Sequence, residues 1–529
     1  MFANLVLTNG NIHTMDKQTP HVEAVAIAQD RILAVGSNSA MRDLLAPDGQ
    51  DIDLAGQTVF PGFIDAHLHF MSYGLSLREI DLVGTNSLNE AVQRVADRAT
   101  TTDHGTWLTG RGWDQVNWAS GFPAKADLDR VAPNHPVFLR RKCGHAGWAN
   151  TQALTAAGIT AATPDPDGGE IERDATTGEP TGILLETAMT LVGDLIAEPT
   201  HDEAVEAVRA AMTHVHKMGI VGVHNMEGAP ALRAFQQLRE DGDLKLRLVQ
   251  QIPEADLDEA IALGIRSGFG DDWIRIGALK IFSDGALGAR TALMVEPYED
   301  EPNNYGIAVA TAEHLDQQIE KAARNGLAVH IHAIGDKANR NVLDAIEKTR
   351  KARIGLHLRH RIEHAQILHP DDVTRFVELD VIPSMQPIHC TQDIVYADAN
   401  WGARSRLAYA WSTLLSTGAV LAFGSDAPVE TPDILTGIYA AVTRRRPDGF
   451  PSEEGWYPEE CITATEAVYA YTLGAAYSAG EEQRKGSITA GKLADLVMLD
   501  RDILTEDASA ILAAAVIGTM VGGKFVYQK

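Results

Sequence analysis

The sequence predicts an α/β protein: a TIM-like (β/α)8 barrel joined to a small β-sandwich that is built from both ends of the chain. Two observations predict this fold. Apolar, strand-like runs alternate with helical segments across residues 60–474, and the two ends, 1–59 and 475–529, are patterned as strands and tight turns. Strands separated by helical segments favour parallel β/α units. About eight such units fit residues 60–474 with room for an insertion.

The two ends of the chain carry hairpin signals. Turn pairs separate β-patterned runs at Asn9-Gly10, Gln29-Asp30 and Gly522-Gly523. Such pairs between alternating apolar runs predict β-hairpins. Neither end holds enough strands to bury the face of a sheet by itself. We therefore predict one β-sandwich domain assembled from residues 1–59 and 475–529, with the barrel between them.

The barrel strands are predicted from the middle of the chain. The run F-P-G-F-I-D-A-H-L-H at 60–69 is the first predicted strand, and the later ones follow helical segments. They lie within 219–226, 273–285, 327–336, 360–366, 380–387 and 419–428. In a parallel barrel the carboxyl ends of all strands meet at one rim, where active sites lie.

Residues 71–200 do not keep this rhythm. The segment has many glycines and prolines around four tryptophans, Trp107, Trp113, Trp118 and Trp148. We expect much of it to be an insertion near the barrel mouth that shapes a pocket. The alternative, in which the aromatic rings only anchor loops, explains the composition equally well.

Charge and composition exclude several classes of function. The chain has 529 residues and a formal net charge of −27, which repels nucleic acids and anionic membrane surfaces. Its three cysteines, Cys143, Cys390 and Cys461, form neither a disulfide framework nor a zinc motif. No signal peptide or membrane-spanning run is visible, so we expect a cytoplasmic protein. A homodimer or a higher homo-oligomer is left open.

Histidines and an aspartate recur where the predicted strands end. His67 and His69 close the first strand, and later strands end at His330, His332, His364 and Asp426. A single H-x-H pair is weak evidence, because histidine is common at polar strand ends. The recurrence at one rim favours a metal site, since imidazole nitrogen and carboxylate oxygen are usual ligands of zinc.

Lys280 lies in a predicted buried strand, I-R-I-G-A-L-K-I-F, where a bare ammonium group is costly. One interpretation is an ion pair with Asp284 or another carboxylate at the rim. The other is that the amine is chemically modified to an anion, which fits between two metal ions.

Several longer motifs run through the chain. They include W-L-T-G-R-G-W-D-Q, F-L-R-R-K-C-G-H-A-G-W-A-N, L-K-I-F-S-D-G-A-L-G-A-R, H-A-I-G-D, R-I-E-H-A-Q, S-M-Q-P-I-H and F-G-S-D-A-P-V. With these motifs and F-P-G-F-I-D-A-H-L-H, the chain resembles the amidohydrolase superfamily over nearly its whole length. It is most similar to the amidohydrolase family 3 branch, which includes YtcJ-like proteins and N-substituted formamide deformylases. The segment K-G-S-I-T-A-G-K-L-A-D-L-V-M-L-D resembles returning strands of that superfamily's split β-sandwich.

The resemblance implies a centre of two zinc ions, with Asp426 as a ligand and as the catalytic residue. The first ion would be held by the first histidine pair and Asp426, the second by two later histidines, with N-carboxylated Lys280 as the bridge. The implied ligands are His67, His69, Lys280, His332, His364 and Asp426. A hydroxide bridging the ions would attack the substrate, with Asp426 as general base and then general acid.

Further residues are candidates for contacting a substrate. These residues, each of which also fits a purely structural role, are His145, His389, Trp113, Asp284, His224 and His330. His330 does not fall at the family's H-A-I-G-D position, so a packing role or the orientation of a ligand is the more natural role for it. Glu186 fits either a pocket or an exposed helix.

The leading hypothesis is metal-dependent hydrolysis of a carbon–nitrogen bond in a small molecule: an amide, an N-substituted formamide, a carbamate or a urea. A second hypothesis is a mononuclear zinc deaminase or related hydrolase on the same scaffold, in which Lys280 is only structural. A third is a binding protein that kept the fold and lost the chemistry. The sequence does not identify the substrate, because the loops of a barrel set specificity.

Overall fold

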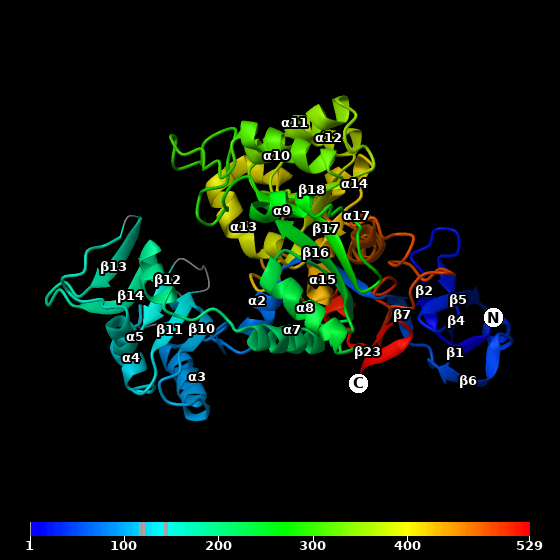
Figure 1. Ribbon diagram of the computed structural model, residues 1–529, viewed down its shortest axis with the longest axis horizontal. Coiled ribbons are helices and arrows are strands. Elements are labelled where there is room, and N and C mark those ends of the chain that lie inside the picture. The colour runs from blue at the N-terminus through cyan, green and yellow to red at the C-terminus, as the bar shows by residue number, and fades with distance from the viewer. Residues whose placement is uncertain (1, 116–117, 119–121, 142–145, 167) are drawn as a thin grey trace. The chain divides into compact units, whose positions relative to one another are not determined.

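The computed structural model describes residues 2–115, 118, 122–141, 146–166 and 168–529. It divides into two compact units (Figure 1). One consists of Met1–Met71 with Val208–Lys529, and the other of Ser72–Ala207. Within the described residues, none of the helices is both long enough and apolar enough to cross a membrane.

The first unit contains an eight-stranded, all-parallel sheet that curls into a nearly closed barrel, as predicted. Its strands follow one another around the barrel in chain order. They are β8 (Phe63–Leu68), β15 (Ile220–Asn225), β16 (Arg247–Pro253), β17 (Ile274–Phe282), β18 (Ala328–Ala333), β19 (His360–His364), β20 (Val381–Met385) and β21 (Ala422–Phe423).

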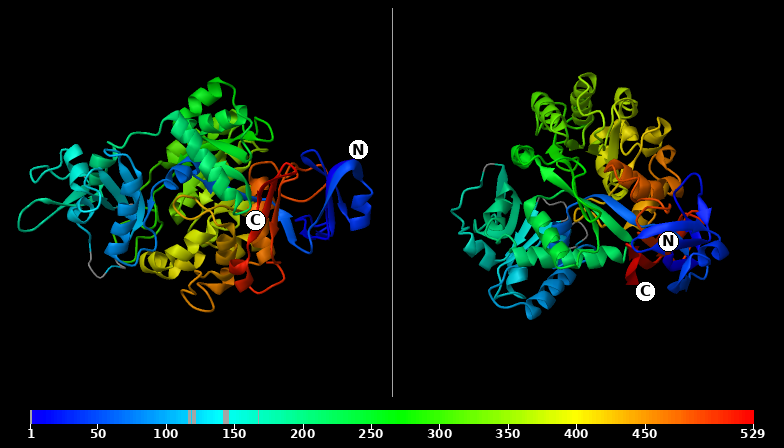
Figure 2. Two further views of the ribbon diagram at one scale, coloured as in Figure 1. Left: turned by 90° about the horizontal axis from the view of Figure 1, so that it is seen from below. Right: turned by 45° about the vertical axis from the view of Figure 1, so that its right-hand side comes forward.

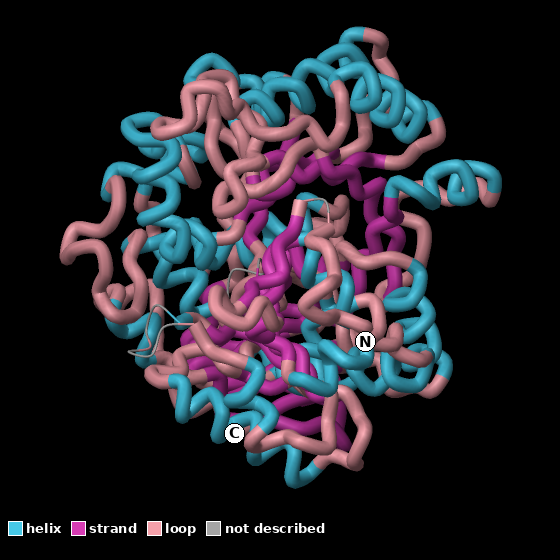
Figure 3. The backbone as a smooth tube through the Cα atoms, turned by 90° about the vertical axis from the view of Figure 1, so that its left-hand side faces the viewer, coloured by secondary structure: helices cyan, strands magenta, loops and turns pink. Residues whose placement is uncertain are grey.

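Helices surround these strands (Figure 3), because each has one apolar face to bury. In α10 (Ala312–Arg324), the Thr311 side chain accepts the backbone N–H of His314 and so caps the first turn. The buried face of α10 consists of Leu315, Ile319, Ala322 and Ala323. The other helices that follow barrel strands include α8 (Ala229–Glu240), α9 (Leu257–Ala262), α11 (Asp336–Lys351), α12 (Arg375–Glu378), α13 (Pro387–Trp401) and α15 (Ile434–Thr443).

The carboxyl-terminal half of the first barrel strand is joined to the segment that follows the last one. The Asp426 N–H donates to the His67 carbonyl over 2.7 Å, and the His69 N–H donates to the Ala427 carbonyl over 2.8 Å. The buried carboxylate of Asp65 accepts the Ser425 N–H at 3.0 Å and the Ser425 hydroxyl at 2.6 Å. These bonds hold the end of β8 against the segment that follows β21.

The first unit has two further sheets, one formed by N-terminal strands alone and the other by strands from both ends of the chain (Figure 2). One contains β5 (Arg31–Gly36), β4 (Ala24–Ala28), β1 (Ala3–Thr8) and β6 (Leu45–Asp53). The other contains β24 (Lys524–Gln528), β23 (Val516–Val521), β22 (Leu496–Leu499), β7 (Thr58–Pro61), β2 (Asn11–His13) and β3 (His21–Val22). Apolar side chains of both sheets share one core that includes Leu7, Ile27, Val59, Leu496 and Met520.

Two of the three predicted hairpins are confirmed. Strands β4 and β5 pair across Gln29-Asp30, and β23 and β24 pair across Gly522-Gly523. The prediction of a hairpin at Asn9-Gly10 is wrong, because β1 and β2 belong to different sheets. Asn9 has a φ of 54°, and this left-handed residue redirects the chain from one sheet to the other.

The second unit, Ser72–Ala207, contains a six-stranded mixed sheet and several helices, of which α3 (Leu88–Thr101) has 14 residues. The strands, in sheet order, are β13 (Gly169–Arg173), β14 (Pro180–Glu186), β12 (Ala146–Ala149), β11 (Val137–Arg141), β10 (Leu108–Trp113) and β9 (Ile80–Asp81). The indole rings of Trp113, Trp118 and Trp148 lie together in the core of this unit. Each indole N–H donates to a backbone carbonyl, so these rings stabilise the unit from within.

Candidate metal centre

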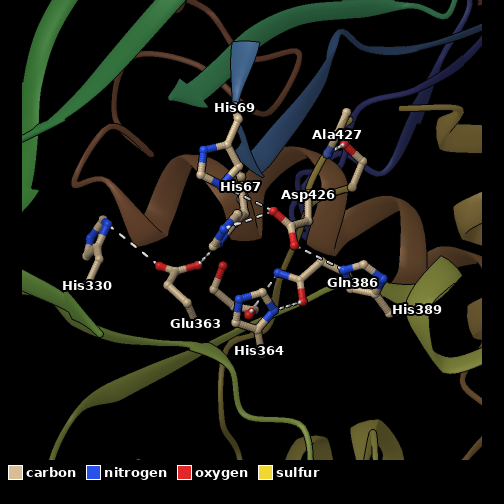
Figure 4. Close-up of polar contacts among 12 residues, drawn as sticks. His67, His69, His330, Glu363, His364, Gln386, His389, Asp426 and Ala427 are labelled. Carbon is tan, nitrogen blue, oxygen red and sulfur yellow. Dashed lines mark hydrogen bonds and ion pairs between the residues drawn. The ribbon is translucent and has the colours of Figure 1, made fainter. Parts of the chain in front are cut away.

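The polar residues predicted to form a site come from the carboxyl ends of barrel strands (Figure 4). His67 belongs to β8, His332 to β18 and His364 to β19, while His69 follows β8 and Asp426 follows β21. His364 has a φ of 72° and Asp426 a φ of 60°. This conformation is costly for residues with a side chain, and such strain clusters at functional sites.

His67, His69 and Asp426 form a first group of three possible metal ligands, with ligand atoms within 4.8 Å of one another. The Nε2 atoms of both histidines lie 3.5 Å from Asp426 Oδ1. Burial lowers the pKa of His67, although the nearby carboxylates oppose this, so its ring is neutral at neutral pH. A neutral imidazole has the lone pair that a metal ion requires.

His364, His389 and Asp426 form a second such group. His389 comes from the first turn of α13, and its Nε2–H donates to Asp426 Oδ2 over 3.2 Å. Burial alone would lower the pKa of His389, but the hydrogen bond and the charge of Asp426 raise it to about 9. Burial alone would raise the pKa of Asp426, but His389, His67 and His364 hold it well below its usual value. The shared carboxylate is therefore ionised at neutral pH.

His332 lies beside these groups, with its ring centroid 4.6 Å from that of His364. Its Nε2–H donates to the Gly285 carbonyl over 2.9 Å, which leaves Nδ1 as the nitrogen with a free lone pair. Burial, together with the charge of Lys280, lowers the pKa of His332 to about 3. His332 is thus a neutral ligand candidate next to His364, outside the two groups of three.

Lys280 is 4% exposed on β17, and its Nζ lies 4.6 Å from the ring centroid of Phe282. Among the residues that the structure describes, it forms no hydrogen bond or ion pair. Burial lowers the pKa of Lys280 to about 8, although the charges of Glu363 and Asp426 oppose the shift. An amine with this pKa is about half neutral, and so available as a nucleophile, at a pH near 8.

One interpretation of the sequence predicted an ion pair between Lys280 and Asp284, but these two residues do not pair. Its buried carboxylate instead accepts the backbone N–H groups of Leu293, Ile334 and Gly335, at 2.8–3.0 Å. Burial raises the pKa of Asp284 to about 7, against these hydrogen bonds. Asp284 therefore holds the loops around His332, and its predicted contact with a substrate has no geometric support.

His224 and His330 lie inside the barrel, 0% and 2% exposed. His224 Nδ1 accepts an N–H of Arg361 at 2.8 Å, and His330 Nδ1 lies 3.7 Å from Glu363 Oε1. Burial, with the charge of Arg361, holds both histidine pKa values well below 6.5. Their surroundings fit a supporting role beneath the site better than contact with a substrate.

The remaining candidates belong to the second unit. Trp113 is 0% exposed in its core, which leaves no ring face for a substrate. His145 lies outside the described residues. Glu186 ends β14 and lines a cavity of about 640 Å³ within this unit, together with Arg141 and Phe122. Glu186 is exposed at the end of a strand rather than within a helix, and its role in a pocket stays a prediction.

Glu363, which the sequence pattern did not single out, contacts one of the candidate ligands. The His67 Nδ1–H donates to Glu363 Oε2 over 2.6 Å, and Glu363 is 0% exposed. Burial opposes its ionisation, but Arg361 and His67 hold the pKa of Glu363 well below its usual value. A signal was available, since Arg361 and Glu363 place two charges on one face of a strand buried in the barrel.

The set of possible ligands fits divalent metal ions. Two groups of histidines share one ionised carboxylate, and the rings of His67 and His364, one in each group, are neutral. Nitrogen and carboxylate oxygen are the ligand types that zinc takes in catalytic sites. His67 and His364 each donate the N–H of one ring nitrogen to a protein oxygen, which leaves the other nitrogen for a metal.

Comparison with known proteins places the chain among hydrolases. The model of the amidohydrolase family matches residues 50–527. The chain is 35% identical to the Protein LONG AFTER FAR-RED 3 of Arabidopsis thaliana, over 99% of this chain and 92% of that protein. It is 34% identical to the putative amidohydrolase YtcJ of Bacillus subtilis, over 98% of each chain. It is 30% identical to the N-substituted formamide deformylase of Arthrobacter pascens, over 99% of this chain and 98% of that one.

Solved structures agree with the sequence comparison. An uncharacterized metal-dependent hydrolase from Pyrococcus furiosus matches with a TM-score of 0.78 and 32% identity, over 95% of this chain and all of that one. A similar hydrolase from Pyrococcus horikoshii matches with a TM-score of 0.80 and 30% identity, over 95% of this chain and 99% of that one.

Proposed function

The chain belongs to the amidohydrolase family, and from that premise we propose that it hydrolyses the carbon–nitrogen bond of a small amide, N-substituted formamide, carbamate or urea. It is a metal-dependent enzyme rather than a binding protein, since its family is that of the amidohydrolases and one relative is an N-substituted formamide deformylase. One observation carries the proposal: Asp426 lies at 3.5 Å or less from three histidines, on both of its oxygens.

We propose two zinc ions at this centre. His67, His69 and Asp426 would hold the first, and His332 and His364 the second, with N-carboxylated Lys280 between them. The neutral rings of His67, His332 and His364 support this assignment, as does the Lys280 amine, which has no hydrogen bond or ion pair among the described residues. Zinc bound there would act as a Lewis acid on the carbonyl group and acidify water to near neutral pH.

The residues of the chain move the proton. Asp426 is ionised at neutral pH, so one of its oxygens can accept the proton of the attacking water. Asp426 would then return the proton to the leaving nitrogen, which cannot depart as an anion. His389, whose Nε2–H donates to Asp426 Oδ2 at 3.2 Å, lies where it can orient that carboxylate and contact the substrate.

A second candidate is a mononuclear zinc deaminase or related hydrolase. It is favoured by the completeness of the group of His67, His69 and Asp426, and by the position of His332 outside both groups of three. In that enzyme Lys280 would be structural. Metal analysis separates the two: about two zinc ions per chain, falling in Lys280→Ala, support the binuclear enzyme. One ion that is unaffected by Lys280→Ala supports the mononuclear one.

The activity is tested with a panel of substrates. Purified protein loaded with zinc is incubated with N-substituted formamides, N-acyl amino acids, carbamates and aryl amides, and the amine released is measured. Asp426→Asn serves as the blank. Release by the wild type alone supports the proposal. A protein that binds no metal, and in which His67→Ala alters only a partner interaction, would instead be a binding protein.

A further inference from the structure

His67 is held at both of its ring nitrogens. Nε2 lies 3.5 Å from Asp426 Oδ1, on the side of the proposed first zinc ion. The Nδ1–H on the opposite side donates to Glu363 Oε2 over 2.6 Å (Figure 4). Because a carboxylate only accepts hydrogen bonds, this contact fixes the proton on Nδ1 and leaves the Nε2 lone pair for the metal.

Glu363 is in turn held by Arg361, and both residues are 0% exposed. An Nη2 of Arg361 lies 2.8 Å and 3.0 Å from the two oxygens of Glu363. The same nitrogen donates to the Ala66 carbonyl at 2.6 Å and to the Ser384 hydroxyl at 2.7 Å. The guanidinium therefore ties the carboxylate to β8 and β20 and leaves it little freedom to rotate.

The two histidines of the proposed second zinc ion are held differently. The His364 Nδ1–H donates to Gln386 Oε1 over 2.9 Å, and the His332 Nε2–H donates to the Gly285 carbonyl over 2.9 Å. Both acceptors are neutral oxygens. Among the contacts between residues that the structure describes, His67 is the one of these three histidines with a hydrogen bond to a charged carboxylate on the nitrogen turned away from its proposed metal.

We propose that Glu363 is the positioning residue that makes the zinc ion at His67, His69 and Asp426 the tighter of the two, with Arg361 holding Glu363 in place. The inference rests on the binuclear centre of the proposed function. An ionised acceptor makes the opposite ring nitrogen a better electron donor and fixes the orientation of the ring. A neutral acceptor has the same two effects, but each is weaker. The two ions should therefore bind with distinct affinities.

The test measures zinc affinity in the full-length protein. Metal-free protein is titrated with zinc in competition with a chromophoric chelator, which gives two dissociation constants for the wild type. In Glu363→Gln we expect the tighter constant to weaken about 10- to 100-fold and the weaker one to stay unchanged. The matched control is Gln386→Ala, which removes the partner of His364 and should weaken only the second ion. Equal weakening of both ions in Glu363→Gln, or none, would overturn the proposal.

A second variant separates positioning from damage to the fold. Glu363→Gln leaves the buried Arg361 without its counter-charge, whereas Arg361→Gln combined with Glu363→Gln leaves no unpaired charge. The double variant should lose the same zinc affinity. If it binds the first ion as tightly as the wild type, Glu363 does not set that affinity. If the wild type binds no zinc at all, the proposed function fails, and this outcome is distinct from the other two.

Discussion

Asp426 and His67 meet twice, through their backbones and through their side chains. The Asp426 N–H donates to the His67 carbonyl over 2.7 Å, and Asp426 Oδ1 lies 3.5 Å from His67 Nε2. The contact that closes the barrel between its first and last strands thus also sets the distance between two proposed ligands. Changes that loosen this closure should therefore affect stability and metal binding together.

Asp426→Asn should lower turnover strongly while leaving the fold intact. The amide cannot take up the proton of the attacking water, so we expect a loss of about 10²- to 10⁴-fold in kcat. Activity on the best substrate of the panel and the far-UV circular dichroism spectrum measure the two effects. Asp371→Asn, at a carboxylate whose side chain is 81% exposed, is the control and should keep full activity. Activity within tenfold of the wild type in Asp426→Asn would rule out its role in proton transfer.

Occupation of the second zinc site should depend on pH and on bicarbonate. The pKa of Lys280 is lowered to about 8 by burial, so its neutral amine increases as the pH rises through 8. Only the neutral amine reacts with carbon dioxide. We expect zinc per chain, measured by atomic emission after desalting, to rise from about one to about two between pH 7 and 9 with bicarbonate. Lys280→Ala should stay near one at every pH. A second ion that loads equally well without bicarbonate would speak against the carboxylated lysine.

His389 should make the stability of the metal-free protein depend on pH. Asp426 raises the pKa of His389 to about 9, against the effect of burial. The contribution of protonated His389 to the free energy of unfolding is therefore fully present below pH 6.5 and is lost as the pH rises through 9. The difference in free energy of unfolding between wild type and His389→Gln should shrink by on the order of 3 kcal/mol over that range. Urea denaturation from pH 6 to pH 10 measures it. Lys280, whose pKa is lowered, makes the folded protein more stable as the pH rises, which is the opposite trend. Because Lys280 is present in both proteins, the difference between wild type and His389→Gln removes its effect. Parallel curves would show that the pair does not form.

The closure of the barrel should depend on Asp65. Its carboxylate accepts the N–H of Ser425, the N–H of His67 and the Ser425 hydroxyl. Asp65→Ala leaves these buried donors without partners and should cost about 3 kcal/mol of stability. Asp65→Asn keeps an oxygen for both backbone groups and should cost about 1 kcal/mol. Urea denaturation of the two variants beside the exposed-site control Asp48→Ala checks the order. Equal losses in Ala and Asn would mean that the hydrogen bonds contribute little.

The barrel and the convergence of His67, His332, His364 and Asp426 were predictable, because parallel strands bring their carboxyl ends to one rim. The details depend on contacts that a sequence pattern does not carry. Asn9-Gly10 carries the same local signal whether the chain returns in a hairpin or crosses to another sheet. The charges of Arg361 and Glu363 on one strand face were visible in the sequence, but the partner of Glu363 was not, because His67 lies 296 positions away.

Residues that do not follow the strand-end rule were the hardest to place. His389 lies on a helix, so the rule that ligands follow the carboxyl ends of strands does not apply to it. Its contact with Asp426, at 3.2 Å, was therefore not predicted. Trp113 was expected near a substrate because aromatic residues line pockets and cores alike. Its complete burial in the second unit could be learned only from three-dimensional packing.

Anomalous diffraction at the zinc edge, from crystals grown with zinc and bicarbonate at pH 8.5, tests the metal centre most directly. We expect two peaks, about 4 Å apart, at the carboxyl ends of the barrel strands, with Asp426 bound to the ion beside His67 and His69. A single peak away from Asp426, or no peak in active protein, would contradict the account.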